Sequence, residues 1–232
     1  MEIAAQLLDW FTAPAQWTGA GGIPARVLEH LLYTVAATTI AVAVGLPIGL
    51  AVGHTGRGGT VAVNTTNVGR AIPSFGIIVL FFFVFGIDPV PAVIMLVALA
   101  LPPIVTNTYV GVRSVAPAVT DSAAGMGLTG WQVLREVEIP VAMPLIMAGI
   151  RTSAVQVVAT ATLAAYIGLG GLGRYIFDGL SQQVLNQVVG GAILVALLAL
   201  ATELVLARVQ RLVVPPGLQA RSRQAAVDAK LT

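Results

Sequence analysis

The sequence contains no cysteine and little charge. Charged side chains make up 9% of the 232 residues, whereas hydrophobic ones make up 57%. Without cysteine there is no disulfide and no thiolate-ligated metal site. The low charge, with a mean hydropathy of +0.91, excludes an ordinary soluble domain, in which about 25% of residues are charged. The composition predicts an all-α integral membrane protein, and the net charge of +2, carried by scattered arginines, indicates no nucleic-acid partner.

Nucleotide, metal and catalytic sites are also missing. The single lysine, Lys230, stands near the end of the chain, so GHTGRGG (Gly53–Gly59) lacks the lysine of a phosphate loop. GLGGLG (Gly168–Gly173) is similar to a dinucleotide-binding fingerprint, but it follows an expected membrane span and not a strand. We expect the first to be a cytoplasmic turn and the second a tight re-entrant or extracytoplasmic turn. His30 and His54 lie at opposite ends of the first apolar run. In a helix they would be about 36 Å apart, which is too far to share a metal ion. We expect a non-enzymatic chain without a bound cofactor, so uphill transport would need another subunit.

Long apolar runs predict the membrane spans. A bilayer core of about 30 Å takes about 20 helical residues per crossing, so a chain of this length holds five or so crossings. Prolines inside these runs predict kinks, whose freed carbonyls must be satisfied by neighbouring helices. The five expected spans are Leu31–Gly53, Ala71–Ile87, Pro89–Val112, a run beginning near Pro140, and about Gln187–Ala207.

The distribution of basic residues predicts the orientation, because cytoplasmic loops carry the excess of arginine and lysine. With five spans, most of these residues fall on one side, so the N-terminus is expected outside and the C-terminus in the cytoplasm. Three regions follow: an extracytoplasmic interfacial segment with a short amphipathic helix (1–27), a transmembrane domain (28–212) and a cytoplasmic tail (213–232). The residues assigned to the cytoplasm are Arg57, Arg70, Arg113, Arg135, Arg208, Arg211, Arg221, Arg223 and Lys230.

A charged, glycine-containing block, residues 121–140, lies in the loop before the fourth span. A short helix is expected up to the glycines, and Thr129 with Gln132 matches a capping box that begins a second helix. In that helix Trp131, Leu134 and Val137/Glu138 are expected to share one face, and Pro140 is expected to break it. The block therefore predicts a helix-turn-helix elbow. Its candidate coupling residues are Asp121, Ser122, Ala123, Ala124, Gly125, Gly127 and Pro140.

The same block resembles the EAA loop of ABC-importer permeases, which docks on the ATPase. The matching residues are Asp121-Ser122-Ala123, Gly127 and Val137-Glu138-Ile139-Pro140, with Asp and Ser in place of the usual Glu and first Ala. From about Glu29 to Gly217, segments such as LPPIVTNTYVGVRSV and AAYIGLGGLGRYIFDGL are similar to permease subunits of osmoprotectant importers, which handle glycine betaine, carnitine and choline.

The resemblance implies a type I ABC-importer permease fold and a set of partners. These are ABC ATPase subunits that bind ATP and Mg, a second permease subunit that is identical or homologous, and a lipid membrane of the bacterial cell. A separate extracytoplasmic substrate-binding protein is expected, because the chain ends soon after its fifth span. Two alternatives remain: a permease for another small polar solute such as an amino acid, or a gated channel or scaffold.

Several interior residues have two interpretations each. Ser74, Asn107 and Thr108 either line the translocation path or bond the loose carbonyls of kinked helices. Phe81–Phe85 either forms an aromatic cage for a quaternary ammonium or packs against lipid and neighbouring helices. Arg151 and Glu203 are expected to pair, because their depths overlap on oppositely directed helices and unpaired intramembrane charges are costly.

Overall fold

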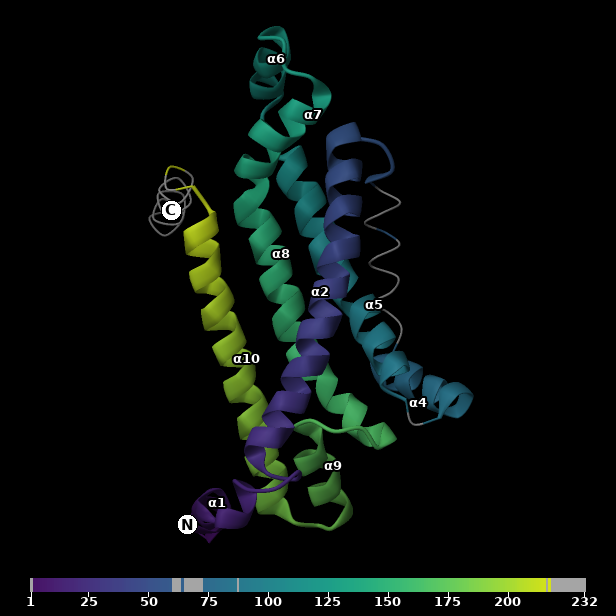
Figure 1. Cartoon of the computed structure of the whole chain (residues 1–232), viewed down its shortest axis with the longest axis vertical. Helices are drawn as coiled ribbons and strands as arrows, with labels where there is room; N and C mark the ends of the chain where they lie inside the picture. Colours follow the sequence, from purple (N-terminus) through teal and green to yellow (C-terminus); the bar gives the residue numbers. More distant parts are fainter. Residues whose placement is uncertain (1, 60–63, 65–72, 87, 216, 218–232) are drawn as a thin grey trace, which may run out of the picture.

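The computed structural model describes residues 2–59, 64, 73–86, 88–215 and 217, and all regular structure within them is helical. Four helices are long and apolar enough to cross a membrane, and they run side by side along the length of the molecule (Figure 1). They are α2 (Ile23–Thr55), α5 (Pro89–Arg113), a continuous helix over Gly130–Ile167 that contains α8 (Ile139–Thr160), and α10 (Leu185–Val213).

Most of the short helices lie at the two ends of this bundle, whereas α4 lies at its side, next to α5 (Figure 1). The end that carries α6 and α7 is called the elbow end below, and the end that carries α1 and α9 is called the loop end. The short helices are α1 (Glu2–Thr12), η1 (Pro14–Gln16), α4 (Ser74–Phe85), α6 (Pro117–Gly125), α7 (Gly130–Gln132) and α9 (Gly173–Ser181).

The second expected span is described only in part. Its helix, α4, has 12 residues, which is about 18 Å and short of the 30 Å or so of a bilayer core. Ala71, Ile72 and Ile87 of the expected span lie outside the described residues. Most of the expected cytoplasmic tail, 213–232, also lies outside them.

Pro140 does not break the helix that precedes it. The chain is helical without interruption from Gly130 to Ile167, and the six residues before α8 form a π-helical segment, η2 (Val133–Glu138), in which Ile139 N–H bonds the carbonyl of Leu134. A proline ring clashes with the carbonyl one α-turn earlier, and the wider π turn accommodates the ring. The sequence interpretation of a break at this proline was therefore wrong.

The core lies where α2, α5 and α8 meet. Ala37 and Ala41 of α2 are fully buried in one cluster with Met95 and Leu96 of α5. About two turns further along α2, a Cβ added to Gly49 would lie 2.6 Å from Thr108 Cβ. Small residues on α2 thus allow its backbone to approach α5 closely, which is how membrane helices gain packing energy without a hydrophobic driving force.

The first span begins earlier than expected. Helix α2 starts at Ile23, with Pro24 in its first turn, so the expected boundary at residue 28 falls inside the helix. Before it, α1 forms the expected short N-terminal helix. Its Trp10 is buried against α10 and α9: the Trp10 and Tyr175 rings are 5.3 Å apart and perpendicular, and a Cβ on Gly190 would collide with the indole.

Candidate functional site

The elbow is built by a glycine-terminated helix. At the end of α6, Gly127 N–H bonds Ala124 O at 2.9 Å and Leu128 N–H bonds Ala123 O at 3.2 Å, which is the Schellman pattern of helix ends. This pattern requires a left-handed residue, and Gly127 has φ +92°. A Cβ there would meet nothing within 4 Å. The glycine is thus needed for its backbone angle and not because the bend lacks room for a side chain.

The second half of the elbow begins with the expected capping box. Thr129 accepts from Gln132 N–H, and the Gln132 side chain accepts from Thr129 N–H at 2.8 Å. These reciprocal bonds satisfy two of the free amides at the helix start. Because α7 runs on through η2 into α8, the capping box fixes the start of one long rod that crosses the bundle.

Exposure on the elbow differs from the expected pattern. Ala123 is 3% exposed and packs inside the elbow, so its small size serves the chain's own packing. Trp131 is 66% exposed, whereas Leu134 is buried, so the two do not share a face. The remaining candidate coupling residues Asp121, Ser122, Ala124 and Gly125 are exposed. Sequence reasoning missed two exposed apolar residues beside them, Val119 and Met126, which are 47% and 76% exposed. The signal that could have identified them was an apolar side chain on a short, polar surface helix.

A second contact missed from the sequence joins α2 to the elbow. His54 Nδ1, at the end of α2, donates to Glu138 Oε2 of η2 at 2.6 Å. The Glu138 side chain is only 9% exposed and that of His54 is 30% exposed. A buried carboxylate needs a partner of this kind. A cavity of about 140 Å³ adjoins Glu138, and Arg113 and Thr120 also line it.

The candidate path residues are not gathered in one place. Asn107 donates to Pro103 O at 2.8 Å, which favours the interpretation that it bonds a carbonyl of its own kinked helix. Thr108 is fully buried against Gly49, with no hydrogen-bond partner for its hydroxyl. Ser74 begins α4 and is partly buried. Ser153, missed from the sequence, donates from α8 to Ala100 O in the proline-containing part of α5.

Arg151 and Glu203 lie together, with Arg151 Nε 3.1 Å from Glu203 Oε1. A third residue, missed from the sequence, joins them: Gln210 accepts from Arg151 Nη1 at 3.1 Å and donates to Pro144 O at 3.3 Å. The network ties α8 to α10. The two charged side chains are about a third exposed, at 32% and 39%.

A cavity of about 420 Å³ lies between α2, α8 and α10. It is lined mainly by apolar side chains, and its polar groups are hydroxyls. The four threonines that line it are Thr34, Thr38, Thr39 and Thr202.

The phenylalanine run does not form a cage among its described side chains. Phe83 and Phe85 are 80% and 62% exposed, and Phe82 packs against the core. The side chain of Phe81 lies outside the described ones. Consecutive helical residues point in different directions, so this arrangement favours packing against lipid and helices.

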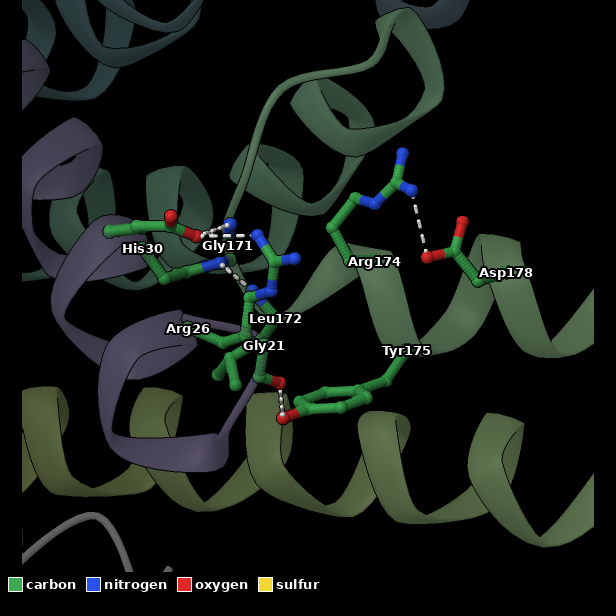
Figure 2. Close-up of polar contacts among 9 residues, drawn as sticks. Gly21, Arg26, His30, Gly171, Leu172, Arg174, Tyr175 and Asp178 are labelled. Carbon is green, nitrogen blue, oxygen red and sulfur yellow. Dashed lines mark hydrogen bonds and ion pairs between the residues drawn. The ribbon is translucent and has the colours of Figure 1, made fainter. Parts of the chain in front are cut away.

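At the loop end, the GLGGLG segment forms the expected tight turn between η3 (Ala161–Ile167) and α9, with Gly168 and Gly171 at positive φ. Two residues of α2 hold it (Figure 2). Glu29 accepts from Gly171 N–H at 2.7 Å and also pairs with Arg26 at 2.9 Å. His30 Nδ1 accepts from Leu172 N–H at 3.3 Å.

The other nitrogen of this histidine sets its protonation. His30 Nε2 lies 2.8 Å from Val158 O, and a carbonyl only accepts, so Nε2 is the donor. Because Nδ1 accepts from Leu172 N–H, it carries no hydrogen, and this pair of contacts fits the neutral ring. Tyr175 OH, further along, donates to Gly21 O at 2.7 Å (Figure 2). The turn is therefore bound to the start of α2 by side chains from both segments.

This architecture, long apolar helices with an elbow at one end and a tethered turn at the other, is that of a multi-pass membrane protein. Residues 33–216 match the family model described as the binding-protein-dependent transport system inner membrane component, and the chain belongs to this family. The expected class of protein is thereby confirmed, as a multi-pass component of the inner membrane.

Individual relatives cover most of the chain. The glycine betaine/carnitine/choline transport system permease protein OpuCB of Bacillus subtilis (strain 168) is 39% identical over 202 residues, which are 87% of this chain and 93% of that protein. The choline transport system permease protein OpuBB of the same organism is 37% identical over the same shares. The osmoprotectant import permease protein OsmW of Salmonella typhimurium is 33% identical over 205 residues, 86% of this chain and 95% of that one.

A solved structure shares the fold. A chain of the MetNI methionine ABC transporter in inward-facing conformations superposes with a TM-score of 0.74, at 21% identity, over 88% of this chain and 100% of that chain. The expected type I importer permease fold is thus confirmed, and the family favours an importer permease over a channel or scaffold.

Proposed function

We propose that this chain forms the translocation pathway for a small zwitterionic or quaternary-ammonium osmoprotectant of the glycine betaine, carnitine and choline class. The observation that carries the proposal is the 39% identity to a glycine betaine/carnitine/choline permease protein over 87% of the chain. Relatives named for choline and for osmoprotectant import support the same class.

The proposed complex has three further components. ABC ATPase subunits bind ATP and Mg and dock at the elbow end, where Val119, Met126 and Trp131 present exposed apolar surface. A second permease subunit, identical or homologous, completes the pathway. An extracytoplasmic binding protein delivers the solute at the loop end. In this orientation the N-terminus is outside and the C-terminus is in the cytoplasm, as the arginine distribution favours.

The elbow geometry supports transmission of movement. The Schellman turn at Gly127 and the capping box at Thr129 hold α6 firmly on the continuous helix that starts at Gly130. When the ATPase closes on ATP, the continuous helix moves together with α6. The translocation pathway then opens alternately to the two sides of the membrane. A flexible loop would absorb the same displacement.

Uptake measurements test the substrate class. The permease is reconstituted into liposomes with its ATPase and binding protein, and ATP-dependent uptake of radiolabelled glycine betaine, carnitine and choline is measured separately. We expect at least one to accumulate, and accumulation to vanish without the binding protein. If none is transported while an amino acid is, the solute belongs to the alternative class and this proposal is refuted.

A further inference from the structure

Three aromatic rings from separate elements converge at the loop end. The rings of Phe75, in α4, and Tyr166, in η3, have centroids 4.7 Å apart and planes inclined by 64°. The rings of Tyr166 and Phe177, in α9, are 5.4 Å apart and inclined by 65°. Tyr166 is 51% exposed and Phe75 is 44% exposed, while Phe177 is partly buried. Tyr166 is therefore the centre of an aromatic surface with open ring area.

We infer that these three residues form a transient binding site for the quaternary ammonium group of the transported solute, an inference that rests on the proposed function. The ring face of an aromatic side chain carries negative charge density and attracts cations. In each edge-to-face contact, the positive edge of one ring meets the negative face of its neighbour. The exposed part of Tyr166 then offers a bulky, weakly hydrated trimethylammonium group both apolar contact and a favourable field.

The site is built on restrained segments. The tethered turn links η3 to α9, and Glu29 and His30 of α2 hold it through the amides of Gly171 and Leu172 (Figure 2). Leu172 is fully buried beneath it. Because η3 and α9 are fixed to α2, the rings of Tyr166 and Phe177 are positioned before a ligand arrives, which lowers the entropic cost of binding.

The charged groups near the site are compatible with weak binding, which lets a transported solute dissociate again. The ionic groups of α9, Arg174 and Asp178, pair with each other at 2.9 Å (Figure 2), so neither offers a full free charge to the ligand. A transport site must bind strongly enough to admit its solute and weakly enough to release it. Aromatic faces beside a carboxylate that is already paired, Asp178, meet this requirement.

A direct binding measurement distinguishes this site from interfacial aromatic anchoring, which places tyrosine at the membrane surface without any ligand. Saturation-transfer NMR on the full-length permease in detergent, without ATPase or binding protein, is recorded with choline and with its neutral isostere 3,3-dimethyl-1-butanol. We expect transfer to the N-methyl protons of choline and much less to the isostere. The Tyr166→Leu variant should lose the signal, and Tyr166→Phe, which keeps the ring, should retain it.

Transport by the reconstituted complex provides the second readout. At saturating loaded binding protein, Tyr166→Leu and Phe75→Leu should each lower uptake by about tenfold, the size of an interaction worth roughly 1–2 kcal/mol. Phe83→Leu, which removes an exposed ring from the same helix as Phe75, is the matched control and should transport normally.

The outcomes separate the two proposals. If the wild-type complex transports the solute while Tyr166→Leu matches it in uptake and in the NMR signal, the rings are membrane anchors only and this inference is refuted. If choline and its isostere give equal signals that Tyr166→Leu does not change, it is refuted as well. A wild-type complex that carries no quaternary ammonium solute refutes the proposed function instead.

Discussion

The contact between His54 and Glu138 leads to a quantitative prediction. The carboxylate is only 9% exposed, and the imidazole nitrogen 2.6 Å away is its hydrogen-bond partner. Removing the partner of a buried charge costs about 3–5 kcal/mol in soluble proteins. Because His54 itself is 30% exposed, water reaches the pair and we expect the lower end, about 3 kcal/mol, for His54→Ala.

A double-mutant cycle isolates the contact. Glu138→Ala alone should also destabilise the permease, but His54→Ala combined with Glu138→Ala should cost less than the sum of the two, with a coupling of about 1–3 kcal/mol. The assay is reversible unfolding in mixed detergent micelles, followed by circular dichroism. Glu136→Gln, which alters an exposed carboxylate of the same π-helical segment, is the control and should stay within about 0.5 kcal/mol of wild type.

The same variants test whether the contact carries movement. In the reconstituted complex, loss of the pair should reduce the solute transported per ATP hydrolysed, because the elbow would then displace α8 without α2. Additive destabilisation in the cycle, together with an unchanged transport-to-hydrolysis ratio in both single variants, would refute the reasoning that the two residues act as one link.

Three further variants have defined outcomes. Gly127→Val forces a β-branched residue to φ +92°, at a cost of about 1–2 kcal/mol, and should reduce co-purification of the ATPase; Gly127→Asn, which tolerates left-handed angles better, should reduce it less. Gly171→Ala places a side chain at positive φ, with its Cβ 3.2 Å from His30 Nδ1. We expect a lower midpoint of thermal unfolding and slower uptake. An unchanged midpoint would contradict the inference that Glu29 and His30 hold the turn. Arg151→Ala should lower the midpoint more than Glu203→Gln, because the amide still accepts from the guanidinium; the reverse order would exclude a structural clamp.

Sequence patterns located the helices best where local chemistry marks both ends. The third expected span, Pro89–Val112, matches α5, Pro89–Arg113, because Asp88 caps its start through Val90 N–H and Arg113 occupies its last turn. The start of α2 was placed too late because the expected span was counted only from the charge-free apolar run at Leu31. The polar residues Glu29 and His30 before it belong to the helix, and they bond amides of the GLGGLG turn, far away in sequence.

Side-chain orientation at the candidate site depended on contacts that the sequence does not contain. The capping box at Thr129 is local and was predictable. The burial of Ala123 and the exposure of Trp131 depend on how α6 folds back over η2, and the π-helical segment changes which residues share a face. Similarly, spacing and depth suggested that Arg151 and Glu203 would meet, whereas Gln210 gave no signal because an amide near a helix end is common.

The longest helix connects the two proposed working parts of the permease. It runs over 38 residues from Gly130, beside the elbow turn, to Ile167, next to Tyr166 of the aromatic site. At about 1.5 Å per residue this is roughly 57 Å, enough to cross the membrane with some length to spare.

The hydrogen-bonding pattern of this helix departs from α-helical near both ends: it is π-helical in η2 and 3₁₀ in η3. Such departures often occur at functional positions. We therefore expect the α-helical middle to transmit a displacement of the elbow as a nearly rigid body, with Glu138 in the π-helical segment at one end and Tyr166 in the 3₁₀ segment at the other. The two proposals together predict that ATP-driven movement at the elbow end alters the aromatic site at the loop end through one continuous backbone.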